Sequence, residues 1–63
     1  MIIQVKDTND EVFHINPSNI VYIKERPNHG LWKIVLVTDE RVMTRDGLQI
    51  KNILRRLSHE ENI

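Results

Sequence analysis

The chain has 63 residues, with nine lysines and arginines against nine aspartates and glutamates, so its formal net charge is zero. Neutral charge argues against a strongly electrostatic nucleic-acid binder, and the absence of cysteine excludes disulfides and thiolate metal sites. One small core supplies on the order of 3–5 kcal/mol in a domain of this size, so self-association or a tightly packed core is expected to supply the remaining stability.

Short segments rich in β-branched residues, separated by polar turns, predict strands. They cover residues 2–6, 11–15, 20–25, 31–38 and 41–45. The turn at 7–10 is dense in Asp and Asn, which tolerate the left-handed backbone conformation. Pro17 keeps Asn16 extended and marks a second turn. Regular spacing of this kind predicts an antiparallel meander.

Residues 31–38 form the strongest predicted strand, because apolar side chains occupy both of its faces. These side chains are Leu31, Trp32, Ile34, Val35, Leu36 and Val37. Such a pattern favours either a central strand or a strand whose outer face meets a partner.

The apolar period changes from strand-like to helical near the end of the chain. A stripe at spacing i, i+3, i+4 and i+7 is formed by Ile50, Ile53, Leu54 and Leu57. Either Thr44 or Asp46 can cap the first turn of this helix. We therefore predict a single domain over residues 1–57, followed by a flexible tail over residues 58–63.

The predicted fold class is α+β, with an antiparallel meander of four to five short strands followed by one C-terminal α-helix. One short helix cannot cover a five-stranded sheet. Either the sheet curls toward a half-barrel, or a second subunit covers the remainder. An uncovered sheet face or edge strand is expected to meet a partner, and the first candidate is another copy of the chain.

No catalytic, metal-binding or cofactor-binding constellation is predicted. The histidines His14, His29 and His59 lack the close spacing of metal ligands. Ser18 lies in a turn and not in a nucleophile elbow. A pocket large enough for catalysis is also difficult to enclose with so short a chain. We expect a protein that is not an enzyme.

Two surfaces are candidates for binding. The first is a predicted protein-binding patch, since large aromatics beside cations are typical of hot spots, and it comprises Lys24, Arg26, His29, Trp32 and Lys33. The alternative for Trp32 is packing in the core. The second is a predicted nucleic-acid surface in the basic 41–56 segment, comprising Arg41, Arg45, Lys51, Arg55 and Arg56. Its helical members are alternatively an ordinary solvated face.

Part of this pattern resembles the FlbD/SwrD family of small flagellar and swarming motility proteins. The matching residues are Phe13, Ile15-Asn16-Pro17, Ile20, Ile23, Glu25, Pro27 and Ile34-Val35-Leu36, before a closing helix. The resemblance implies a non-enzymatic accessory protein that acts on flagellar motor function.

A second resemblance is to the first half of the LytTR DNA-binding domain. It rests on residues 20–25, on the hairpin around residues 32–44, and on the helical segment from Leu48 to Leu57. This resemblance implies DNA binding, although the second, basic half of that domain has no counterpart in the match.

The leading hypothesis is a small adaptor or regulatory protein that binds another protein and self-associates. The alternatives are a nucleic-acid-binding transcriptional regulator and a phage- or mobile-element-encoded inhibitor of a host protein. The longest apolar run, residues 34–37, is far shorter than the ~20 residues of a membrane span. No signal-peptide pattern opens the chain, so a cytoplasmic location without a membrane partner is expected.

Overall fold

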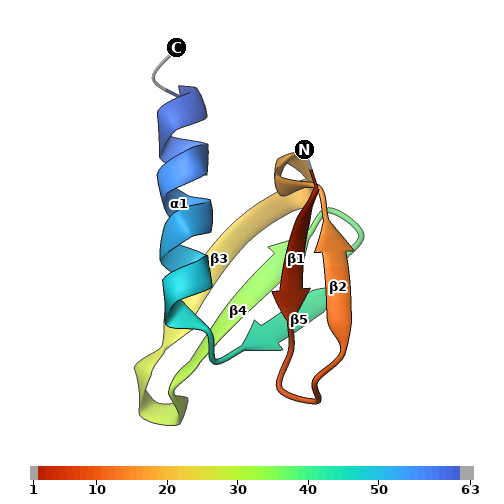
Figure 1. Ribbon diagram of the computed structural model, residues 1–63, viewed down its shortest axis with the longest axis vertical. Helices are drawn as coiled ribbons and strands as arrows, with labels where there is room; N and C mark the ends of the chain where they lie inside the picture. The colour runs from red at the N-terminus through yellow and green to blue at the C-terminus, as the bar shows by residue number, and fades with distance from the viewer. Residues whose placement is uncertain (1, 62–63) are drawn as a thin grey trace.

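Two small antiparallel sheets and one helix make up the described part of the chain, which is residues 2–61 in a computed structural model (Figure 1). The elements are β1 (Ile3–Lys6), β2 (Val12–Ile15), η1 (Pro17–Asn19), β3 (Ile20–Arg26), η2 (Pro27–His29), β4 (Leu31–Leu36), β5 (Arg41–Thr44) and α1 (Gly47–Glu61). The strand orders are β1-β2 and β3-β4-β5. The predicted α+β class is confirmed, and neither sheet closes into a barrel.

Two of the three hairpin turns place an acidic residue in the left-handed conformation, and the β3–β4 turn places Gly30 there. Asp10 has φ 64° and Asp39 has φ 69°, a region that Asp enters more readily than most residues. In the first turn, the carboxylate of Asp7 accepts hydrogen bonds from the backbone N–H of Asn9 at 2.8 Å and of Glu11 at 2.9 Å. The Asp and Asn content of these turns therefore determines where the strands reverse.

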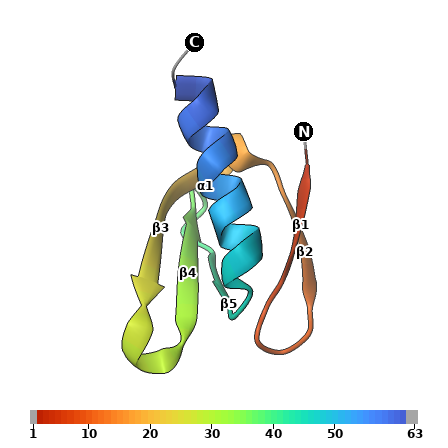
Figure 2. The same ribbon diagram turned by 60° about the vertical axis from the view of Figure 1, so that its left-hand side comes forward.

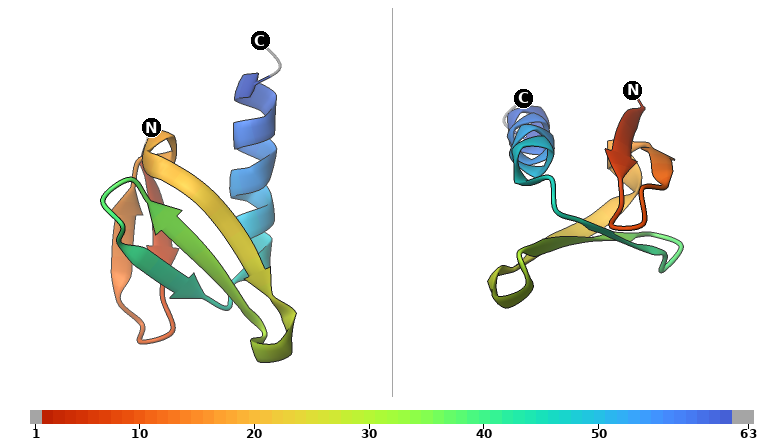
Figure 3. Two further views of the ribbon diagram at one scale, coloured as in Figure 1. Left: turned by 180° about the vertical axis from the view of Figure 1, so that it is seen from behind. Right: turned by 60° about the horizontal axis from the view of Figure 1, so that its bottom comes forward.

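Helix α1 and the β1–β2 hairpin lie side by side on one side of the β3–β4–β5 sheet (Figures 2 and 3). The core fills the space between these three parts, with buried side chains from Val5, Ile15, Ile34, Val42, Ile50 and Ile53. The Thr44 hydroxyl donates to the Lys6 carbonyl at 2.9 Å, and the Thr8 N–H donates to the Met43 carbonyl at 3.1 Å. The opposite face of the β3–β4–β5 sheet has neither α1 nor the hairpin over it (Figure 3).

Strand β4 is the central strand of its sheet, as one of the two sequence alternatives predicted. Ile34 is fully buried, and Val35 on the opposite face is only 7% exposed. Trp32 points to the same side as Ile34 and packs against the core. A Cβ atom at Gly47 would lie 3.3 Å from the Trp32 indole nitrogen, so glycine lets the start of α1 approach this ring closely.

Helix α1 begins at the position predicted from the sequence, but it buries fewer side chains than the predicted apolar stripe contains. Asp46 is the N-cap, because its carboxylate accepts the Gln49 N–H at 3.1 Å. Ile50 and Ile53 are buried. Leu54 belongs to the apolar stripe predicted from the sequence, yet 41% of it is exposed, so it is not part of the buried core. Leu54 lies at the flank of the helix beside β3, where no further strand covers it.

The helix also extends beyond its predicted end. Residues 58–61 continue α1, whereas the sequence prediction placed them in a tail beyond the helix. Neither proline nor glycine occurs after Gly47, so the usual stop signals of a helix are absent from the sequence. Residues 62–63 of the predicted tail lie outside the described residues. No helix within residues 2–61 is long and apolar enough to cross a membrane.

Candidate binding surface

The uncovered side of the β3–β4–β5 sheet presents a continuous set of side chains. Residues that face each other across a ladder point to the same side. Tyr22 faces Val35, Lys24 faces Lys33 and Arg26 faces Leu31 between β3 and β4, while Lys33 faces Met43 and Val35 faces Arg41 between β4 and β5. We call this set the outer face, and it comprises Tyr22, Lys24, Arg26, Leu31, Lys33, Val35, Arg41 and Met43.

The charge of the outer face is of one sign. Its cations are Lys24, Arg26, Lys33 and Arg41, and no carboxylate belongs to the set. Lys24 and Lys33 are direct cross-strand partners, an arrangement that costs roughly 0.2–1 kcal/mol. Lys6 and Asp10 form an ion pair at 3.7 Å, away from the outer face. The cations of the outer face therefore have no carboxylate bound to them.

Apolar side chains lie among these cations. Tyr22 is 46% exposed, and the Lys33 Nζ lies 5.9 Å from the centre of its ring, within cation–π range. Val35 is nearly buried beneath them, and Met43 is half-buried. The surface thus has an apolar floor with flexible positive groups around it, which suits an anionic ligand that also makes apolar contacts.

The structure separates the residues of the predicted protein-binding patch. Lys24, Arg26 and Lys33 come together on the outer face. His29 is exposed in η2, within the turn that joins β3 to β4. Trp32 belongs to the opposite side of the sheet, because strand residues alternate and its neighbour Lys33 faces outward. The structure therefore does not bring Trp32 together with the lysines of the patch, and Trp32 packs against the core, as the alternative interpretation had it.

The predicted nucleic-acid set is also divided between two sides of the sheet. Arg41 joins the outer face, and Arg45 is exposed just after β5. Lys51, Arg55 and Arg56 belong to α1, which lies on the other side of the sheet (Figure 3). The 41–56 segment is therefore not a single basic surface.

Sequence reasoning missed Tyr22, Val35, Met43 and the addition of Arg41 to the lysines. Strand alternation was the available signal, because every second residue of a strand shares a face. The pairing of β3 with β4 and of β4 with β5 then brings residues from three strands together. Side chains that could hold a metal ion do not gather into a group of three or more among the residues described.

No protein-family model, curated protein or solved structure matches this chain. The function is therefore inferred from the chemistry of its own surfaces.

Proposed function

We propose that this chain is a small non-catalytic adaptor or regulatory protein that binds an acidic segment of another protein on its outer face. The observation that supports this proposal is the direct pairing of Lys24 with Lys33, with Arg26 and Arg41 on the same face. Like charges in cross-strand positions destabilise the free domain. A bound carboxylate relieves that repulsion, so the arrangement favours an anionic ligand.

A protein ligand fits the surroundings of the outer face better than a nucleic acid. The adjacent turn contains the exposed carboxylates of Asp39 and Glu40, which confine the negative groups of a ligand to the region of the four cations. A peptide can place a few acidic side chains there, whereas an extended phosphate backbone would continue past it. Binding of nucleic acid also gains its affinity from many phosphate contacts, and the net charge of the chain is zero. Val35 and Met43 instead offer apolar contact to side chains of a peptide.

Single-stranded nucleic acid is the second candidate, and the exposed ring of Tyr22 beside Lys33 favours it. Bases stack on exposed aromatic rings, each such contact contributing about 1–3 kcal/mol. The outer face offers one ring of this kind among the described residues, whereas proteins that bind single strands usually combine several. We therefore rank this candidate below an acidic protein segment.

Replacing Lys24 by glutamate is expected to stabilise the fold and to weaken the binding of an acidic peptide at the same time. The new carboxylate faces Lys33, so an unfavourable pair becomes a favourable one, with a gain of roughly 0.2–1 kcal/mol in the free energy of unfolding. Affinity for a labelled glutamate-rich peptide should fall by about tenfold or more, the equivalent of 1.4 kcal/mol. Urea unfolding and fluorescence anisotropy at low salt measure the two effects.

The matched control is Lys51→Glu, the same substitution on the exposed surface of α1. It should leave peptide affinity unchanged, because α1 lies on the other side of the sheet. Equal losses in the two variants would contradict binding at the outer face. A labelled oligothymidine that binds more tightly than the peptide would favour the second candidate.

We also propose that the chain self-associates, but through a surface other than the outer face. Two copies that meet through this face would bring their cations together. Exposed apolar side chains occur instead on Val21, at the open edge of β3, and on Leu54 of the neighbouring α1, which are 59% and 41% exposed. Together with Leu57 they border a groove of about 340 Å³ between β3 and α1. A second copy would cover this apolar border.

Replacing Leu54 by aspartate is therefore expected to shift the chain toward monomer with little loss of stability, because Leu54 is not a core residue. Size-exclusion chromatography with light scattering, over a range of concentrations, measures the molecular mass of the parent chain and of the Leu54→Asp variant. A parent chain that stays monomeric at high micromolar concentration would contradict self-association.

The two resemblances name different partners for such an adaptor. Under the FlbD/SwrD resemblance, the partner belongs to the flagellar motor, and the location is cytoplasmic. Under the LytTR resemblance, the ligand is DNA, which the oligonucleotide titration addresses. A role as a phage- or mobile-element-encoded inhibitor is a third proposal for the same binding chemistry, and the genes that neighbour the coding sequence distinguish it from the others.

A further inference from the structure

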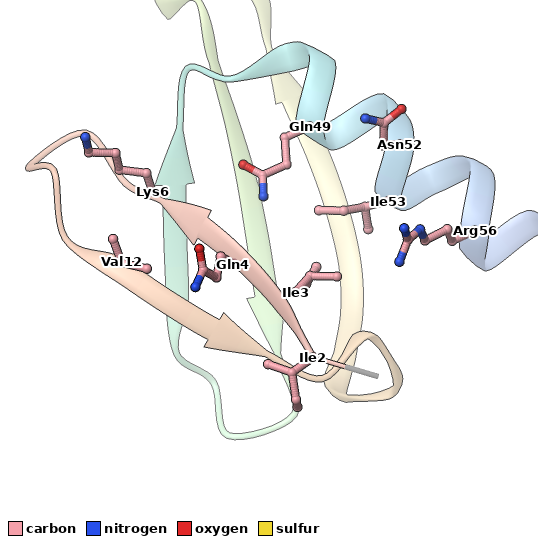
Figure 4. Close-up of a pocket in the computed structure, with 9 residues that line it drawn as sticks. All are labelled: Ile2, Ile3, Gln4, Lys6, Val12, Gln49, Asn52, Ile53 and Arg56. Carbon is pink, nitrogen blue, oxygen red and sulfur yellow. The ribbon is translucent and has the colours of Figure 1, made fainter.

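A second candidate site is the groove between β1 and α1, on the side of the β3–β4–β5 sheet opposite the outer face. It has a volume of about 570 Å³, within the range of ligand-binding clefts. Figure 4 shows Ile3 on the β1 wall and Ile53 on the α1 wall, with Lys6 near one end of the groove and Arg56 near the other. The groove therefore runs along a strand on one wall and a helix on the other.

The strand wall has an open hydrogen-bonding edge. Since β1 pairs only with β2 among the described strands, one edge of β1 has no neighbouring strand. The Asp7 N–H donates to the Glu11 carbonyl at 2.9 Å, and hydrogen-bonded pairs alternate along an antiparallel ladder. Val5 therefore bonds to β2, whereas the backbone groups of Gln4 and Lys6 point away from β2.

A hydrogen bond from Thr44 agrees with this outward direction of the Lys6 backbone. Thr44 donates to the outward carbonyl of Lys6 at 2.9 Å, so the open edge of β1 faces the segment that leads into α1. Within residues 2–61, no hydrogen bond satisfies the outward N–H and C=O of Gln4 or the outward N–H of Lys6. Strand edges of this kind readily accept a further strand.

The side chains around the groove also suit a polypeptide. Gln4, Gln49 and Asn52 provide carboxamides, which both donate and accept hydrogen bonds and so match peptide groups. The lining includes the cations Lys6 and Arg56 and no carboxylate. Lys6 pairs with Asp10 at 3.7 Å, but both side chains are mostly exposed, so this pair is weak and can exchange for another carboxylate.

We propose that an extended, acidic segment of a partner protein binds in this groove and adds as a third strand to the open edge of β1. Its backbone pairs with Gln4 and Lys6, its apolar side chains contact Ile3 and Ile53, and its acidic side chains lie toward the cations at the two ends. Strand addition of this kind derives affinity from main-chain hydrogen bonds and specificity from the alternate side chains.

The location of the groove gives the adaptor two separate binding sites. The groove lies between β1 and α1, on one side of the β3–β4–β5 sheet, and the outer face lies on the other side (Figure 3). A ligand in one site does not block the other, so two partners can be held together by a single chain.

Amide hydrogen exchange on the full isotope-labelled chain tests the proposal. The probe is a nine-residue peptide of alternating valine and threonine with glutamate near each end. At saturation, exchange at Gln4 and Lys6 should slow by about tenfold or more, the equivalent of one hydrogen bond. Exchange at Val5 should change little, because its N–H already bonds to β2. No binding at millimolar peptide, or binding without protection of Gln4 and Lys6, would overturn the proposal.

A pair of variants at one position isolates the backbone contribution. Gln4→Pro removes the outward N–H, and proline is tolerated where this group faces away from the ladder. It should weaken peptide binding by about tenfold. Gln4→Ala keeps the N–H and should weaken binding much less. Equal affinities of the two variants would show that the edge of β1 makes no such bond, and the proposal would fail.

A charge exchange decides the matter if Gln4→Pro does not fold. The double variant Gln49→Glu with Asn52→Asp adds two carboxylates to the lining of the groove, and affinity for the acidic peptide should fall by about tenfold. A peptide with lysine in place of glutamate should bind this double variant with the affinity that the acidic peptide has for the parent chain. Absence of both effects would overturn the proposal.

A second copy of the chain is the competing occupant of the groove. Protection of the Gln4 amide from exchange that grows with protein concentration, in the absence of peptide, would assign the groove to that second copy and overturn the proposal.

Discussion

Replacing Ile50 by alanine is expected to unfold this domain. Ile50 is fully buried on the face of α1 that packs against both sheets. Removing a buried isoleucine side chain costs about 2–5 kcal/mol, and a core of this size supplies only about 3–5 kcal/mol. Far-UV circular dichroism should show loss of folded structure, and the urea midpoint should fall toward zero.

Leu54→Ala is the matched control, because it makes a similar truncation one turn later on the same helix. With 41% of Leu54 exposed, the expected loss of unfolding free energy is only about 1 kcal/mol. A loss as large as that of Ile50→Ala would show that Leu54 is a core residue after all, as the helical stripe in the sequence predicted.

Replacing Thr44 by valine is expected to cost about 1–3 kcal/mol in unfolding free energy. Thr44 is fully buried, and its hydroxyl bonds to two segments. It donates to the Lys6 carbonyl at 2.9 Å and accepts from the Asp46 N–H at 3.1 Å. Valine has nearly the same shape but leaves both backbone groups without their partner, and urea denaturation measures the cost.

Thr44→Ser provides the comparison that separates the hydroxyl from the methyl group. Serine keeps both hydrogen bonds, so the loss relative to the parent should be smaller than with valine. If valine is as stable as threonine at this position, the hydroxyl does not hold the β1–β2 hairpin to the start of α1.

Local features of the fold were predictable because short-range physics determines them. The Asp and Asn residues around Asp10 fix the first turn, since they enter the left-handed conformation and bond their own backbone. The Asp46 cap marks the start of α1. Apolar character on both faces of residues 31–37 indicated a central strand, and the burial of Ile34 and Val35 confirms it.

Features that depend on the arrangement of elements were not predictable from residue patterns. The five strands form two sheets, because the β1–β2 hairpin crosses to the side where α1 lies. That division leaves Leu54 at the flank of the helix, outside the contact stripe. For the candidate site, the sequence grouped Lys24 with Trp32 by proximity, whereas strand alternation places them on opposite sides and adds Arg41 from two strands away.

Every strand pairs only with strands that are next to it in the chain, and this has a consequence for the order of folding. Chains with mostly local contacts fold quickly, and both sheets here consist of consecutive hairpins. The bond between Thr44 and Lys6, by contrast, joins residues 38 positions apart. We expect this contact to form late, when two preformed sheets dock. The groove between β1 and α1 would then be the last part of the molecule to appear, and brief undocking would open it without unfolding either sheet.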